Sequence, residues 1–280
     1  MSPLALLTLS ACGGSSTVTP STVSGAVVKG PLSNALAFLD LNKDGVQDSG
    51  EPNVRTGSDG SYSLTTSDTD YNIVAVTDGS TVDTSTGAVL AGVTLSASKG
   101  ASVITPMTTL MEQGGLTVAQ VASIFQLPAG VDPLSFNPFA ADADPASALA
   151  MEKVSQQIMT VVTAFASAAE GAGGGEAASF AAAMKAVVDV VKFKATKLDD
   201  AGASAADKTL DLTNTADLAS IQSNAETEML TVAGVNTTAF NTLAADTATA
   251  VKNVNTKIDS ITDTDLSSDA SKNIFTTSQV

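Results

Sequence analysis

The sequence contains no histidine and no tryptophan, and it has a single cysteine among 280 residues. Without histidine, the chain cannot build the Ser–His or Cys–His nucleophile systems or a histidine-based zinc site. Aromatic residues make up only 4% of the chain, so a sugar-binding face of stacked rings is disfavoured. A lone cysteine cannot form a disulfide within the chain. These absences argue against several common catalytic and binding sites.

Basic residues are also scarce. Lysine and arginine total 13 against 29 aspartates and glutamates, which gives a formal net charge of −16. A protein that binds nucleic acid needs a basic face for the phosphates, so we expect no nucleic-acid partner. After the N-terminal region no segment offers about 18 uncharged apolar residues in a row, so we expect no membrane-spanning helix.

The single cysteine lies at the end of a short apolar run. Cys12 closes "PLALLTLSAC" and is followed by the flexible stretch "GGSS". These residues resemble the lipobox of bacterial lipoproteins, in which the cysteine thiol is lipidated and becomes the new N-terminus. The resemblance implies a signal peptide over residues 1–12, lipidation at Cys12 and a tether over residues 13–21. The protein would then be extracytoplasmic, and the lipid would anchor it to the bacterial outer membrane or cell surface.

The alternative interpretation is an ordinary apolar N-terminus with a chance cysteine. No lysine or arginine precedes the apolar run, whereas a signal peptide normally begins with a positively charged segment. On the lipobox interpretation, we therefore expect the signal peptide to begin upstream of Met1.

The hydrophobic pattern changes near residue 104. Between residues 22 and 104, short segments rich in Val, Leu, Tyr and Thr alternate with clusters of Gly, Asp, Asn and Ser. This pattern predicts strands in "TVSGAVVKG", "ALAFLDL", "SYSLTT", "YNIVAVT" and "AVLAGVTLSA". Asp59-Gly60 predicts a hairpin turn. Several short strands at this spacing favour a small β-sandwich.

From residue 105 to residue 280, apolar residues recur with helical spacing. Pro106 suits the first turn of one helix, and Thr117 can cap the next. Further stripes comprise Met151, Val154, Ile158, Val161 and Phe165; Phe180, Met184, Val187 and Val191; Leu218, Ile221 and Ala225; and Phe240, Leu243, Val254, Ile258 and Ile261. Narrow, alanine-rich stripes suit close packing in a bundle. The sequence therefore predicts an α+β chain with two domains, a β-sandwich over residues 22–104 and an Ala-rich α-helical bundle over residues 105–280.

The segment "DLNKDGVQDSGE", residues 40–51, matches the calcium-loop pattern D-x-[DN]-x-[DN]-G-x5-E at every position. Ca²⁺ takes about six to eight oxygen ligands, and alternate residues of a turning loop aim their side chains inward. Gly45 would permit the sharp bend. The expected Ca²⁺ ligands are the side chains of Asp40, Asn42, Asp44, Asp48 and Glu51 and the backbone carbonyl of Val46. A solvated acidic turn is the alternative.

The flanks of this loop favour strands over the helices of an EF-hand, and Pro52 opposes a following helix. The segment "VSGAVVKGPLSNALAFLDLNKDGVQDSGEPNVRTGSDGSYSL" resembles the calcium-binding B-type and carboxypeptidase-regulatory-like modules of bacterial surface proteins. In those families a "D-x-N-x-D-G-x-x-D-x-x-E-P" loop precedes a "D-G-x-Y" turn. The resemblance covers residues 22–76 and implies an immunoglobulin-like or prealbumin-like β-sandwich that Ca²⁺ orders.

These interpretations favour a non-enzymatic, calcium-binding surface lipoprotein that acts in adhesion or as an envelope scaffold. Its expected partners are the membrane, through the lipid anchor, and a protein or glycan ligand at the cell surface. One alternative is a glycan-processing lipoprotein, catalytic or accessory, that uses two Asp or Glu side chains facing each other in a cleft. Another is a carbohydrate-binding module, which the lack of tryptophan disfavours. We predict no catalytic residues and no cofactor other than Ca²⁺.

Replacing Cys12 tests the lipid anchor. Because serine has no thiol to carry the lipid, we expect Cys12→Ser to move the protein from the membrane fraction to the soluble fraction of bacterial cells. Ser15→Ala, in the tether, is the matched control and should leave the fractionation unchanged. Membrane association of the full-length Cys12→Ser variant equal to that of the wild type would contradict the lipobox interpretation.

Overall fold

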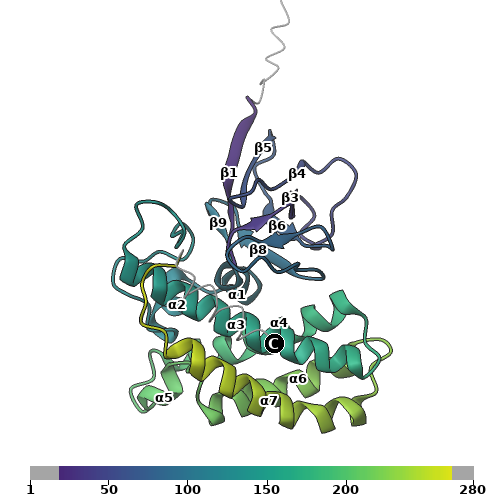
Figure 1. Cartoon of the computed structure of the whole chain (residues 1–280), viewed down its shortest axis with the longest axis vertical. Coiled ribbons are helices and arrows are strands. Elements are labelled where there is room, and N and C mark those ends of the chain that lie inside the picture. Colours follow the sequence, from purple (N-terminus) through teal and green to yellow (C-terminus); the bar gives the residue numbers. More distant parts are fainter. Residues whose placement is uncertain (1–18, 267–280) are drawn as a thin grey trace, which may run out of the picture.

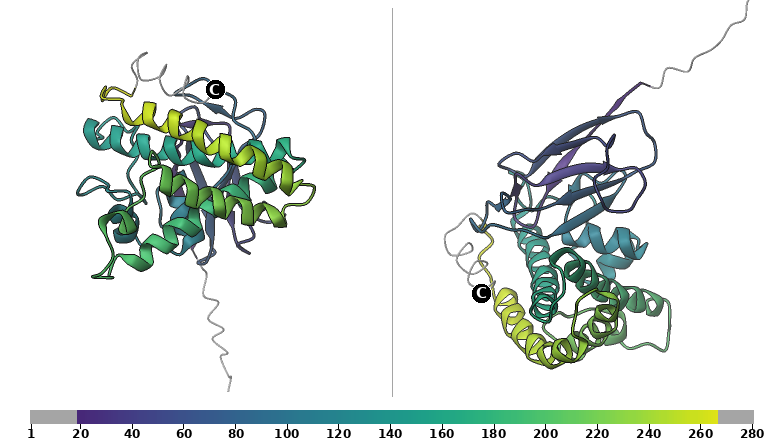
Figure 2. Two further views of the ribbon diagram at one scale, coloured as in Figure 1. Left: turned by 90° about the horizontal axis from the view of Figure 1, so that it is seen from below. Right: turned by 90° about the vertical axis from the view of Figure 1, so that its right-hand side faces the viewer.

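Strands precede helices along the chain, as the change in hydrophobic pattern predicts. The computed structural model describes residues 19–266, so Cys12 and the predicted signal peptide lie outside the described residues. Figure 1 shows the strands in one layer and the helices in another, with α1 (Pro106–Gly114) between them, and the side view in Figure 2 agrees. The α+β class predicted from the sequence is confirmed.

The described strands form three sheets. One sheet has the order β5–β1–β9, a second pairs β2 with β7, and the third has the order β4–β3–β6–β8. Their pairs are antiparallel except for β1 and β9, which run parallel. The strands are β1 (Ser21–Val27), β2 (Leu32–Ser33), β3 (Leu36–Asp40), β4 (Asn53–Arg55), β5 (Ser61–Thr66), β6 (Asn72–Val76), β7 (Val82–Asp83), β8 (Thr94–Ser98) and β9 (Val103–Ile104).

Burial along the strands follows their place in the sheets. In β5 the side chains of Tyr62, Leu64 and Thr66 are buried, whereas the residues that alternate with them are exposed. This is the pattern of a strand with one face on the core and one in water. By contrast, β3 and β6 are the inner strands of the third sheet and are buried along most of their length.

Two strand predictions are wrong in detail. The Asp59-Gly60 turn forms, with Gly60 at φ 77°, but the strands beside it do not pair with each other. Instead β4 pairs with β3 and β5 pairs with β1, so the chain changes sheets at this turn. The segment 88–97 is not one strand, because Gly92 at φ 70° interrupts the extended chain and β8 begins only at Thr94.

Pro106 lies in the first turn of α1 and Thr117 caps α2, as predicted, while the cap of α1 is Thr105. Thr105 and Thr108 form a capping box around the start of α1, and Thr117 and Gln120 do the same for α2. Within residues 19–266 none of the helices combines the length and the apolar character that crossing a bilayer needs. The later helices are α2 (Val118–Ile124), α3 (Pro145–Gly171), α4 (Glu176–Lys197), α5 (Ala205–Lys208), α6 (Thr215–Glu228), η1 (Met229–Thr231) and α7 (Thr237–Asp259).

Most residues of the predicted helical stripes are buried, and the clearest exception lies on α7. The stripes predicted for α4 and α6 are buried throughout. Leu243 is 42% exposed, so its assignment to the core is wrong. Residues four apart share a helix face, so Ala244 rather than Leu243 follows Phe240 into the core, and Val251 continues that face.

Helix α1 joins the two layers. The hydroxyls of Thr108 and Thr109 donate to the Ser96 carbonyl on β8, at 2.8 and 3.3 Å. The Glu112 carboxylate accepts from the Asn72 amide at 2.7 Å and from the Ser96 hydroxyl at 2.8 Å. One cluster of buried apolar side chains runs from the sheets through α1 to α3 and α4. The two layers therefore share a core, while the division into domains at residue 104 stays a prediction.

Two glycines allow the turn between α3 and α4 to touch the segment before α7. Gly173 and Gly234 have φ angles of 104° and 88°. A Cβ atom on either residue would lie 2.6 Å from the carbonyl oxygen of the other. Only glycine fits so close a backbone approach at such a φ angle.

We expect Gly173→Ala to lower the free energy of unfolding by about 1–3 kcal/mol, because alanine is strained at this φ and its methyl group would meet backbone. Gly171→Ala is the matched control, since Gly171 is the last residue of α3 and has open space around its Cβ position. Urea unfolding of the two variants measures the difference. Equal stability of both would contradict the close approach.

Candidate functional site

The acidic loop of residues 40–51 joins two neighbouring strands of the third sheet. It leaves β3 at Asp40 and reaches β4 at Asn53. The inner strand β3 is paired with β4 on one side and with β6 on the other. The Leu39 N–H donates to the Pro52 carbonyl at 2.9 Å, which closes the base of the loop. The sheet therefore fixes both ends of the loop.

Asp40 organises the first half of the loop. This residue is 2% exposed, and its Oδ1 accepts from the N–H groups of Lys43 at 2.6 Å and Asp44 at 3.3 Å. Its Oδ2 accepts from the Gly45 N–H at 2.8 Å. Lys43 and Gly45 have φ angles of 63° and 77°, so the chain turns sharply around the carboxylate. A buried carboxylate is thus surrounded by backbone donors.

Glu51 connects the two halves of the loop from its other end. This residue is 6% exposed. Its Oε1 accepts from the Leu41 N–H at 2.7 Å, and its Oε2 accepts from the Asp48 N–H at 2.9 Å. Both oxygens of the last predicted ligand therefore face the loop interior.

Asn42, Asp44 and Asp48 form the exposed rim of the loop. The Asn42 Nδ2 donates to Asp44 Oδ2 at 3.0 Å and to Asp48 Oδ2 at 2.9 Å. The Val46 N–H donates to Asp44 Oδ1 at 2.8 Å, and the Val46 side chain is 60% exposed. The structure therefore brings three of the predicted ligands together around one carboxamide.

The side chains of this loop are not arranged as a ready metal centre. Across residues 19–266 no group of three or more carboxylate, thiol or imidazole side chains is placed to hold a metal ion. In the loop, Asp40 and Glu51 accept from backbone N–H groups, and the Asn42 amide lies between the two rim carboxylates. All the predicted ligands lie in one loop, and their assignment to Ca²⁺ stays a prediction.

The charges of the loop nevertheless suit a hard cation. The loop carries four carboxylates, and its one lysine, Lys43, bonds Asp70 outside the loop at 2.6 Å. Ca²⁺ prefers carboxylate, carboxamide and carbonyl oxygens, which are the donors present here. A half-turn of the Asn42 carboxamide would present its oxygen in place of its nitrogen, because the two ends of an amide have the same shape. The residues present therefore fit Ca²⁺.

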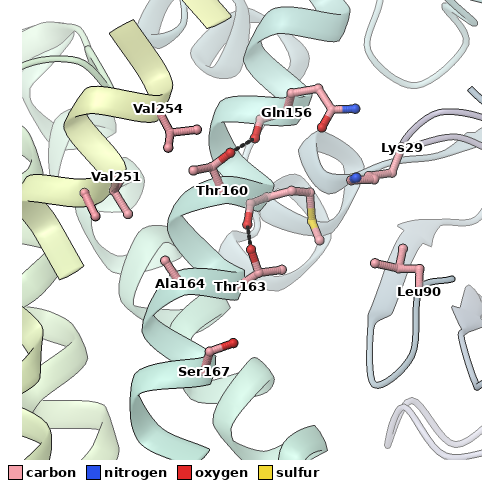
Figure 3. A pocket seen from close by; sticks show the side chains of 11 residues that line it. Lys29, Leu90, Gln156, Thr160, Thr163, Ala164, Ser167, Val251 and Val254 are labelled. Carbon is pink, nitrogen blue, oxygen red and sulfur yellow. Dashed lines mark hydrogen bonds between the residues drawn. The ribbon is translucent and has the colours of Figure 1, made fainter. Parts of the chain in front are cut away.

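A cavity of about 350 Å³ lies between the two layers (Figure 3). Residues of α3 and α7 line two of its sides, and Lys29 and Leu90 contribute from the β layer. Lys29 is only 3% exposed and pairs with Asp83 at 3.4 Å. The Thr160 and Thr163 hydroxyls donate to carbonyls within α3, so the walls of the cavity are mostly apolar.

Sequence reasoning missed the buried charged residues beside this cavity. Lys29, Asp83 and Glu152 are 3%, 1% and 1% exposed. Glu152 offered no signal, because it lies about 100° around α3 from Met151 and so outside the predicted stripe. Lys29 falls within the predicted strand "TVSGAVVKG", and Asp83 belongs to the two-residue strand β7, which is too short to show periodicity.

Asp40→Asn tests the role of the buried carboxylate in the loop. An amide nitrogen cannot accept, so at least one N–H among those of Lys43, Asp44 and Gly45 would lose its acceptor. We expect the free energy of unfolding to fall by about 1–3 kcal/mol and exchange of these amides to become faster. Ser49→Ala, at an exposed position of the same loop, is the control. Unchanged amide exchange in Asp40→Asn would contradict the arrangement.

Comparison with known proteins adds no assignment to this geometry. No protein-family model, no curated protein and no solved structure matches the chain. The functional argument therefore rests on the residues of the chain itself.

Proposed function

We propose that this chain is a non-enzymatic, calcium-binding lipoprotein of a bacterial surface that acts in adhesion or as an envelope scaffold. The observation that supports the proposal is the loop of residues 40–51, with buried carboxylates at both ends and oxygen-bearing side chains on its rim. In this proposal residues 22–104 form an immunoglobulin-like or prealbumin-like β-sandwich. Residues 105–280 form an Ala-rich α-helical bundle, and Cys12 carries the lipid.

The cation would be held by every predicted ligand of the loop. These are the side chains of Asp40, Asn42, Asp44, Asp48 and Glu51 and the carbonyl of Val46. When ionised, the four carboxylates carry a formal charge of −4, and one Ca²⁺ reduces it to −2. Ca²⁺ supplies charge neutralisation and cross-links the two halves of the loop. The rim is exposed, so an ion can enter from solvent without opening the fold.

The affinity for Ca²⁺ decides in which surroundings the loop would bind the ion. Extracellular modules with such loops bind Ca²⁺ with dissociation constants of about 10⁻⁴ to 10⁻³ M. A ligand at about 100 times its dissociation constant adds roughly 2.7 kcal/mol to the stability of a native state that alone binds it. Millimolar calcium outside the cell is about one to ten times these dissociation constants, so it would fill roughly half or more of the loops and add about 0.4–1.4 kcal/mol. This agrees with the proposed surface location.

The glycan-processing alternative needs two carboxylates that face an open cleft. Asp83 and Glu152 are buried on opposite sides of the boundary between the layers, but neither lines the cavity of Figure 3. A substrate in that cavity would meet Lys29 and Gln156 instead. Asp189, Asp207 and Asp217 line a larger cleft of about 840 Å³, but their carboxylates bond Lys185, Ser204 and Lys194. We therefore retain the non-enzymatic proposal.

Calcium titration tests the proposal. We expect millimolar Ca²⁺ to raise the melting temperature and to protect residues 40–51 from proteolysis, because only the folded loop gathers the ligands. Mg²⁺ should act weakly, since it gives up its waters reluctantly. Asp44→Asn should reduce the Ca²⁺ effect by removing one ligand charge.

Asp59→Asn is the matched control. Asp59 lies in the neighbouring acidic turn, where its carboxylate accepts from the Ser61 N–H at 3.0 Å, and it contributes no predicted ligand. This variant should keep the full Ca²⁺ effect. Calorimetry without heat, together with no stabilisation by millimolar Ca²⁺, would show that the loop is only an acidic turn.

A further inference from the structure

Glu152 is a buried carboxyl group with one oxygen that has no partner. It lies on α3 and is 1% exposed. The Gln156 Nε2, one turn further along the same helix, donates to its Oε1 at 2.6 Å. Its Oε2 is buried without a hydrogen-bond partner among the described residues. A carboxylate in this place would be an anion with half of its hydrogen-bonding capacity unused, which is costly.

The charged groups facing Glu152 come from the β layer. Lys29, in the turn after β1, pairs with Asp83 of β7 at 3.4 Å, and both side chains are almost fully buried. The Oδ1 of Asp83 also accepts from the N–H and hydroxyl of Ser85, at 2.9 and 2.6 Å. Lys29 is therefore already paired with a carboxylate of its own layer.

Burial is the main cause that raises the pKa of Glu152 to about 8, from an ordinary value of 4.5. The hydrogen bond from Gln156 lowers the pKa, the charge of Asp83 raises it, and the charge of Lys29 lowers it. The rise in pKa from burial and from the Asp83 charge is thus larger than the fall caused by Gln156 and Lys29. This balance agrees with the geometry, in which Lys29 already has a partner.

Several charged groups on the helices packed against α3 have partners elsewhere. Glu112 of α1 bonds the sheet. On α4, Lys194 bonds Asp217 at 2.7 Å, and Lys185 bonds Asp189 and Glu228. On α7, Lys252 bonds the Thr215 hydroxyl. The charged groups that act on Glu152 are Asp83 and Lys29, both of the β layer.

We propose that Glu152 is a proton-binding site buried at the boundary between α3 and the β layer, and that losing this proton loosens the contact between the layers. The boundary is closed while the group is a neutral acid beside the Lys29–Asp83 pair. After the proton leaves, the boundary contains two carboxylates and one ammonium group, all excluded from water. Relief requires either water at Oε2 or a shift of Lys29 away from Asp83, and either change alters the buried contact between the layers.

The sign of the pH dependence follows from the raised pKa. Between pH 4.5 and about 8 the folded chain keeps a proton that the unfolded chain has lost. Stability from this group is therefore complete below pH 4.5, falls as the pH rises, and stops falling above about pH 8. A one-proton difference makes the unfolding equilibrium constant rise about tenfold per pH unit inside that window.

Unfolding of Glu152→Gln at several pH values tests the proposal. Glutamine keeps the shape of the neutral acid but cannot lose the proton. In the wild type we expect the unfolding equilibrium constant to rise about tenfold per pH unit between about pH 5.5 and 7.5, and we expect Glu152→Gln to lack this rise. Glu170→Gln, at an exposed position near the end of the same helix, is the matched control and should keep the rise. Parallel pH profiles for the wild type and Glu152→Gln would overturn the proposal.

Two measurements at the site separate a proton switch from a simple change of stability. Carbon-13 NMR of labelled glutamate in the wild type should show one side-chain carboxyl that titrates near pH 8, and this measurement stands even if Glu152→Gln fails to fold. Hydrogen exchange at pH 9 should be faster in the wild type than in Glu152→Gln at the Val28 and Thr84 amides, which flank Lys29 and Asp83. Titration of all glutamates below about pH 5.5, or equal exchange in the two proteins, would contradict the proposal.

Discussion

The position of Asp40 depends on β3, an inner strand that backbone hydrogen bonds hold from both sides. These bonds to β4 and β6 fix the register of β3, and with it the place of its last residue. That carboxylate then accepts from three backbone N–H groups and shapes the turn after it. Glu51 completes the loop from the other end, where β4 returns to the sheet. The geometry of the candidate site is therefore set by the sheet, and the loop residues only add ligands.

The two layers are held by contacts of opposite character. Helix α1 is fastened to β8 by threonine hydroxyls that are fully satisfied, and apolar side chains continue the core beneath it. At the boundary between α3 and the β layer, Glu152 is instead buried under the influence of the Lys29–Asp83 pair, and its Oε2 has no hydrogen-bond partner among residues 19–266. Buried ion pairs with an additional carboxyl group contribute little net stability and respond to pH. We infer that α1 keeps the layers together, while the contact between α3 and the β layer loosens when Glu152 loses its proton.

The sequence was most informative where short-range chemistry decides the structure. Thr117 starts a helix as predicted, because a threonine side chain can satisfy a free N–H group of a first turn, and Pro106 lies in the first turn of another. The acidic loop could likewise be recognised, since its residues lie within twelve positions. Features that depend on distant partners could not be predicted. Examples are the parallel pairing of β1 with β9, the exposure of Leu243 and the meeting of Lys29 and Asp83 with Glu152.

The central claim is that residues 40–51 enclose one calcium ion. Its most direct test is a crystal structure of the chain grown with millimolar Ca²⁺, with an anomalous difference map calculated at a long wavelength. The account predicts one peak inside the loop, about 2.3–2.6 Å from oxygens of Asp40, Asn42, Asp44, Val46 and Glu51, with Asp48 bound directly or through water. A map without a peak, with the Asn42 amide still bonded to Asp44 and Asp48, would contradict it.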